Sequence, residues 1–135
     1  MRQGRETAST AHRSFGRWVR ILAAVGFAAG LAVVALLTLL PSAHVPATAL
    51  PDKLGHFLAY FVLAVLGRLA FQGPFSLAVV LIGLPLYGGA LELAQWGMGV
   101  GRWAEIRDAA ANGLGAWAGS FAYSIARRIS AAAAR

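Results

Sequence analysis

Cysteine is missing from the sequence, and charged residues are scarce. The 135 residues include no cysteine, only 13% charged residues and just five Asp and Glu. Without cysteine, the chain cannot form a disulfide, a thiolate metal site or a cysteine nucleophile. Hydrophobic residues make up 59% and the mean hydropathy is +0.65. This balance is far more apolar than that of an average soluble domain and indicates a membrane protein.

The positive charge does not indicate a nucleic-acid partner. The net charge is +7, but five of the twelve basic residues lie in the first twenty positions, before any apolar run. No groove-reading motif or aromatic-plus-basic pattern is present. We therefore expect basic cytoplasmic tails at residues 1–20 and 127–135, lying at a membrane surface, and no nucleic acid.

Four apolar runs approach the ~20 residues that cross a hydrocarbon core of about 30 Å as a helix. They cover residues 21–40, 54–71, 75–96 and 108–126, and "QGP" at 72–74 is a strong loop signal. The sequence therefore predicts an all-α polytopic membrane protein, with four transmembrane helices in a domain at 21–126. The loop signal predicts a short hairpin between helices 2 and 3. A cleaved signal peptide is the alternative for the first run, although that run is longer than usual for such a peptide.

The basic residues also predict the orientation of the chain. Cytoplasmic loops of membrane proteins carry an excess of Lys and Arg. With a cytoplasmic N-terminus, three basic residues lie outside, namely Lys53, Arg102 and Arg107. The cytoplasmic side then holds nine basic residues, so both termini are expected in the cytoplasm. The nine are Arg2, Arg5, Arg13, Arg17, Arg20, Arg68, Arg127, Arg128 and Arg135.

Polar residues cluster at the outer ends of spans two to four. Residues three or four apart share a helix face, so each span has one polar stripe. In the fourth span, Gly115 and Gly119 form a G-x-x-x-G pair that allows close helix packing. We expect the stripes to converge into one site, and its candidate residues are Asp52, Lys53, His56, Glu92, Gln95, Arg102, Asp108 and Asn112.

These residues carry a resemblance to a known family. "DKLGHFLAYFVL" at 52–63, "ELAQ" at 92–95, Arg102, and Asp108 with Asn112, Gly115 and Gly119 resemble, in this order, the motifs of the VanZ-like family of small bacterial membrane proteins. The resemblance covers about residues 52–119 and departs at "GMGVG" (97–101) and Arg107. It implies a multi-pass protein of the bacterial cytoplasmic membrane. The family is named for a protein linked to resistance to glycopeptide antibiotics such as teicoplanin, and the resemblance supplies no reaction.

Several chemical roles are compatible with these residues. No serine or threonine accompanies His56 as a nucleophile. His56 with Asp52 or Glu92 could act as an acid-base site, or these groups could simply stabilise a helix N-terminus. Glu92, Arg102 and Asp108 could clamp three helices together or bind a ligand. A metal site and a cofactor are not predicted, because Lys53 and Arg102 offer neutralising charge and no metal spacing is recognised.

Two functions remain open. The first is a non-enzymatic protein whose outward-facing polar pocket binds or shields a membrane lipid or a lipid-linked envelope precursor. The second is a membrane enzyme that acts on such a lipid by acid-base chemistry. The lack of a nucleophile or a phosphate-binding loop favours binding. An oligomer is compatible with the sequence, and four spans show no inverted repeat typical of a transporter.

Overall fold

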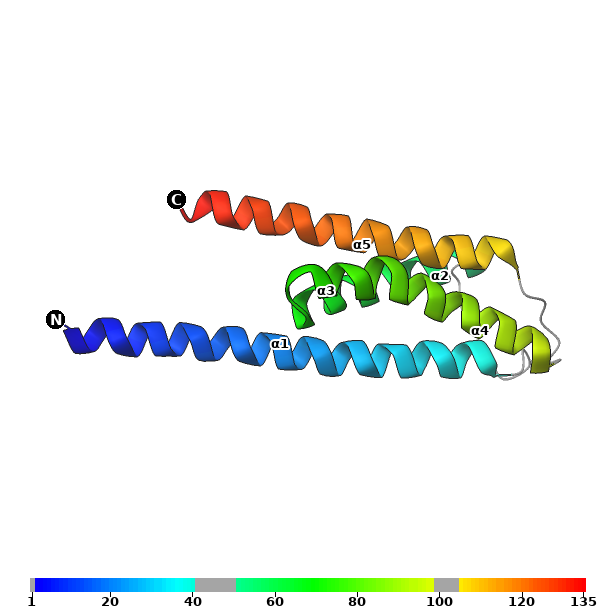
Figure 1. The fold of residues 1–135 in the computed structure, drawn as a ribbon, viewed down its shortest axis with the longest axis horizontal. Coiled ribbons are helices and arrows are strands. Elements are labelled where there is room, and N and C mark those ends of the chain that lie inside the picture. The colour runs from blue at the N-terminus through cyan, green and yellow to red at the C-terminus, as the bar shows by residue number, and fades with distance from the viewer. Residues whose placement is uncertain (1, 41–50, 99–104) are drawn as a thin grey trace.

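The protein is a bundle of long helices (Figure 1). The computed structural model describes residues 2–40, 51–98 and 105–135, with side chains from residue 15 onward, and contains no strand within these ranges. A π-helical segment, Val79–Gly83, joins α3 to α4. The α-helices are α1 (Arg2–Leu39), α2 (Asp52–Ala70), α3 (Gly73–Ala78), α4 (Leu84–Met98) and α5 (Ile106–Ala133). The prediction of an all-α protein is confirmed.

Three helical segments are long and apolar enough to cross a membrane. They are Phe15–Leu39, Asp52–Ala70 and the continuous segment Gly73–Met98. Many large apolar side chains on these segments are exposed, including Leu22 and Leu86 at 67% and 68%. Contiguous apolar surface of this kind suits contact with lipid rather than water. The prediction of several membrane spans is therefore supported for three helices, and α5 does not meet the same criterion of apolarity.

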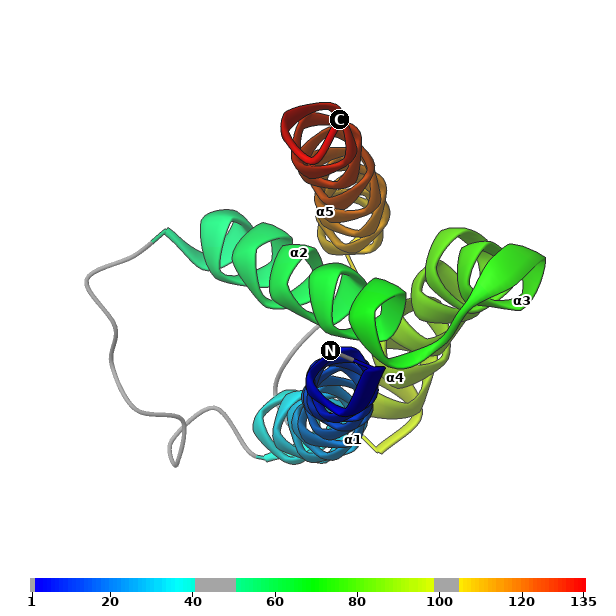
Figure 2. The ribbon, with the colours of Figure 1, turned by 90° about the vertical axis from the view of Figure 1, so that its left-hand side faces the viewer.

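Successive helices run in opposite directions along the bundle (Figure 1). The segment from α3 to α4 returns antiparallel to α2, and only Phe71 and Gln72 separate α2 from α3. Gly73 has a φ of +67°, a left-handed conformation that glycine adopts at little cost. This tight turn agrees with the predicted short hairpin. The described N- and C-terminal ends lie at the same end of the bundle, and α2 lies between α1 and α5 (Figure 2).

The buried core lies around α2. Side chains from α1, α2, the π-helical segment, α4 and α5 meet there and form one continuous cluster. Tyr60, Ala64, Val80 and Ala116 are almost completely inaccessible. The full cluster consists of Phe27, Tyr60, Leu63, Ala64, Val80, Leu84 and Ala116.

The most extensive helix contact joins α2 and α5, which run in parallel. A β-carbon on Gly115 would lie 2.2 Å from the Phe57 carbonyl oxygen, and one on Gly119 would lie 2.3 Å from the Phe61 carbonyl oxygen. Neither distance is compatible with a side chain, because these neighbours are backbone atoms. The two glycines of the G-x-x-x-G pair therefore allow the backbones of α2 and α5 to approach.

Pro85 lies directly after the π-helical segment. Proline has no N–H, so the carbonyl oxygen of Leu81, four residues earlier, cannot receive the usual α-helical hydrogen bond. The indole N–H of Trp117 donates to this Leu81 oxygen at 3.3 Å. This contact explains how the interior proline is tolerated, and it ties the third span to α5.

Replacing Gly115 by alanine should destabilise the protein. The added methyl group meets backbone that cannot rotate away, so we expect a loss of roughly 1–3 kcal/mol from overpacking. Gly113 is the matched control, because a β-carbon there meets nothing within 4 Å. Gly113→Ala should leave stability unchanged or raise it slightly, since alanine favours helix. Thermal unfolding of both variants in detergent tests this, and equal midpoints would contradict the proposed close contact.

Candidate functional site

The beginnings of α2 and α5 lie at the same end of the bundle, opposite the two chain ends (Figure 1). Polar side chains from the first turns of both helices meet there. Asp52 and Asp108 lie within these first turns, where a carboxylate interacts favourably with the positive end of the helix dipole. We call the group the α2–α5 polar cluster, and it consists of Asp52, Lys53, His56, Glu105, Asp108 and Asn112.

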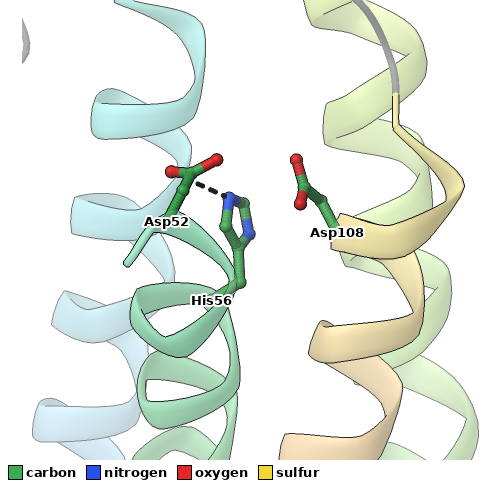
Figure 3. Close-up of side chains that lie close together, drawn as sticks. All are labelled: Asp52, His56 and Asp108. Carbon is green, nitrogen blue, oxygen red and sulfur yellow. Dashed lines mark ion pairs between the residues drawn. The ribbon is translucent and has the colours of Figure 1, made fainter. Parts of the chain in front are cut away.

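His56 is held by a buried amide. Its Nδ1 lies 3.0 Å from Oδ1 of Asn112, whose exposed fraction is only 1%. An amide oxygen only accepts hydrogen bonds, so Nδ1 must carry the proton and donate. In the neutral ring, the lone pair is therefore on Nε2, which lies 4.0 Å from Oδ1 of Asp52. The imidazole is fixed in its orientation and its second nitrogen faces a carboxylate (Figure 3).

Lys53 joins the two helices through acidic partners. Its Nζ donates to Oε2 of Glu105 at 2.9 Å and lies 3.5 Å from Oδ1 of Asp108. Lys53 and Glu105 are about half exposed, whereas the Asp108 side chain is only 8% exposed. Sequence reasoning missed Glu105 as a site residue. Its position three residues before Asp108, at the start of a helix, was the available signal.

Of the three remaining predicted polar residues, two lie on α4. Glu92 and Gln95 are buried, with exposed fractions of 5% and 3%. The Gln95 amide donates to the backbone oxygen of Thr38 near the end of α1. Gln95 therefore connects α4 to α1. Arg102, the predicted partner of Glu92, lies outside the described residues, so the proposed clamp stays a prediction.

Gly88 brings the polar face of α4 close to the α2–α5 polar cluster. A β-carbon on this glycine would lie 2.7 Å from both the Asn112 Nδ2 and the Tyr60 hydroxyl oxygen. The absence of a side chain at Gly88 therefore makes room for a buried tyrosine from α2 and a buried amide from α5. At this level α4 lies against polar side chains of α2 and α5.

Arg68 forms a separate polar contact, near the end of α2. Its guanidinium donates to the buried Ser76 hydroxyl and lies 5.2 Å from the centre of the Tyr123 ring. Ser76 in turn donates to the Gly73 carbonyl oxygen at 2.9 Å. This contact braces the α2–α3 turn against α5. It also occupies Ser76, so this hydroxyl is not a nucleophile for His56.

The α2–α5 polar cluster can bind, orient and exchange protons. It combines a cation, three carboxylates, an imidazole and an amide, and so can recognise both donors and acceptors. Neither Ser nor Thr is among these six residues, so the arrangement does not form a nucleophile–histidine–acid triad. One nitrogen of His56 is held by Asn112, and the other faces Asp52. Atoms of Asp52, His56 and Asp108 that can ligate a metal all lie within 4.8 Å of one another.

Three comparisons were made with known proteins. No family model, no curated protein and no solved structure matches this chain. The resemblance to the VanZ-like family therefore stands on the motifs in the sequence. Functional inference depends on the residues and contacts described above.

The Lys53–Glu105 pair should make stability sensitive to acid. The hydrogen bond from the Lys53 ammonium holds the pKa of the Glu105 carboxyl below its ordinary value of 4.5. A carboxyl whose pKa is lowered by folding stabilises the fold at pH values above its pKa in the unfolded state. This contribution is lost as the pH falls through the pKa of the folded state. Glu105→Gln should therefore have a smaller drop in unfolding temperature between about pH 5 and pH 3 than the unchanged protein. Identical acid dependence in thermal unfolding would show that the pair has no role in stability.

Proposed function

We propose that this chain is a VanZ-like integral membrane protein of the bacterial cytoplasmic membrane. Its α2–α5 polar cluster would face outward and bind or shield a lipid-linked component of the cell envelope. The observation that carries the proposal is the division within this cluster. Asp52, Lys53 and Glu105 are exposed, whereas Asp108 and Asn112 are buried. Exposed charges can reach a headgroup while buried groups keep the site in shape.

The likeness of the motifs to the VanZ-like family directs the proposal toward the envelope. Binding or shielding of an envelope component would change how that component is presented to an antibiotic. A change in susceptibility to glycopeptides such as teicoplanin is the expected phenotype. The proposal requires neither a cofactor nor a nucleophile.

We also propose that α5 is the fourth span and that both termini are cytoplasmic. α5 has 28 residues and is therefore about 42 Å long, enough to cross the hydrocarbon core. Its glycines and alanines make it weakly apolar, but its close contact with α2 supplies a membrane-buried partner. Four crossings agree with the two chain ends lying at one end of the bundle (Figure 1). That end also contains Arg127 and Arg128, in accord with the positive-inside rule.

Acid-base catalysis on an envelope lipid is the alternative function. The observation that favours it is the geometry of His56, whose Nε2 faces Asp52 while Nδ1 is fixed by Asn112. Such an imidazole could take a proton from a substrate and return it during a reaction. An enzyme would release a changed product, whereas a binding protein would retain its ligand unchanged.

Loss of the Lys53 charge should weaken ligand retention. Lys53 is the cluster's exposed ammonium, and a hydrogen bond to a charged group is worth roughly 1.5–3 kcal/mol. Lys53→Gln should therefore reduce retention of an anionic envelope lipid by about tenfold or more. Arg107→Gln is the matched control, because it removes an exposed cation at the same end of α5. Native mass spectrometry of gently extracted protein would measure the lipid adduct.

The same experiment can separate binding from catalysis. His56→Gln keeps a donor for the Asn112 oxygen but removes the imidazole nitrogen that could accept a proton from a substrate. A binding protein should keep its lipid adduct in this variant, and no altered lipid should form with either protein. If the unchanged protein converts an envelope lipid extract and His56→Gln does not, the enzymatic function is correct. Equal adducts in the unchanged protein, Lys53→Gln and Arg107→Gln would remove the α2–α5 polar cluster as the binding site.

The orientation has its own test. A phosphatase that is active only outside the cytoplasm should be inactive when fused after Arg135. The same phosphatase should be active when inserted between Pro46 and Ala49, in the segment that connects α1 to α2. The reverse pattern would overturn the outward position of the cluster. Activity of the enzyme at both positions would show that α5 does not cross the membrane.

A further inference from the structure

Three potential metal ligands from two helices lie close together (Figure 3). Asp52 and His56 are four residues apart on α2 and therefore share one face. Asp108 approaches from α5, on the other side of the imidazole. Each residue offers one ligand atom, and all these atoms lie within 4.8 Å of one another. Ligand atoms around a tetrahedral Zn²⁺ are about 3.3 Å apart. Rotation of the exposed Asp52 side chain could bring its carboxylate oxygen to this distance from the other two ligand atoms.

Asn112 supplies the outer partner that a metal-binding histidine requires. Such histidines usually donate their other ring N–H to a carbonyl or carboxylate oxygen, which fixes the tautomer and the orientation of the ring. Nδ1 of His56 donates to Oδ1 of Asn112 at 3.0 Å. Only 1% of Asn112 is exposed. The free lone pair is consequently on Nε2, the nitrogen that faces Asp52. This observation is independent of the acidic residues.

Asp108 is a buried carboxylate aimed into the same group. Asp108 is only 6% exposed. Its Oδ1 atom is inaccessible to solvent and accepts no hydrogen bond within the described part of the chain. The Nζ of Lys53 lies 3.5 Å from this oxygen but is closer, at 2.9 Å, to Glu105. The sequence did not predict a metal site, because Lys53 and Arg102 could neutralise the acids and no metal spacing is recognised. In the structure, the Lys53 ammonium is shared between Glu105 and Asp108.

We propose that Asp52, His56 and Asp108 form a binding site for a divalent transition-metal cation, with Zn²⁺ as the best fit. One imidazole nitrogen and two carboxylate oxygens form a ligand set that zinc accepts, and three protein ligands leave a fourth position open. Mg²⁺ and Ca²⁺ prefer oxygen ligands alone, so they should bind more weakly. The cation would stabilise the buried Asp108 carboxylate while Lys53 keeps its bond to Glu105. This site goes beyond the proposed lipid binding and does not depend on it.

Metal titration of the full-length protein tests the site. The purified chain would be stripped with a chelator in detergent, without envelope lipid, and titrated with ZnCl₂ or MgCl₂ by calorimetry. We expect Zn²⁺ to saturate at one ion per chain, to raise the unfolding temperature and to bind at least tenfold more tightly than Mg²⁺. His56→Gln and Asp52→Asn should each weaken Zn²⁺ binding at least tenfold. Asp108→Asn should do the same if it folds.

Matched variants make the outcome decisive. Glu6→Gln removes a carboxylate that is not part of the α2–α5 polar cluster, so Zn²⁺ binding should persist. A double variant of the two other histidines, His12→Gln with His44→Gln, should also bind normally. Absence of saturable Zn²⁺ binding, or binding that is lost in the His12/His44 variant and kept in His56→Gln, would overturn the proposal. Because lipid is absent, failure of the lipid experiment would leave a positive metal result intact.

Discussion

The close approach of α2 and α5 is the constraint on which the rest of the structure depends. Gly115 and Gly119 lie against the carbonyl oxygens of Phe57 and Phe61, four residues apart on each helix. Because the helices are parallel, this spacing fixes their register along the whole contact. Nearer the helix beginnings, the side chains of Asn112 and His56 are then close enough to form their hydrogen bond. The packing glycines therefore also position the polar cluster.

Much of this arrangement could be predicted from local patterns. Long apolar runs and the "QGP" turn indicate helices and a hairpin, because length, hydropathy and glycine conformation are properties of short segments. The alignment of Asp108, Asn112, Gly115 and Gly119 follows from the helical period alone. The proposed fourth span, α5, has less support from hydropathy than the other three segments, because its small residues make it less apolar. The proposal for α5 therefore depends on its contact with a neighbouring helix.

The choice of partners could not be predicted in the same way. Gln95 donates to Thr38 on α1 rather than joining His56, and Lys53 bonds to Glu105, which no motif marks. These pairings depend on where side chains of distant segments arrive after packing. The contact between Trp117 and Leu81 has the same origin, since Pro85 leaves the carbonyl free but does not specify its donor.

Folding and the chemistry of the site are coupled through α5. Its buried face carries glycines in one part and Asp108 and Asn112 in another, so the same helix supplies close packing and polar function. Glycine in the middle of a helix is unfavourable, and burial of a carboxylate is costly unless it is compensated. Both costs fall when α5 lies against α2, where the backbones fit together and Asp108 meets Lys53. The polar cluster can therefore exist only once these two helices have packed.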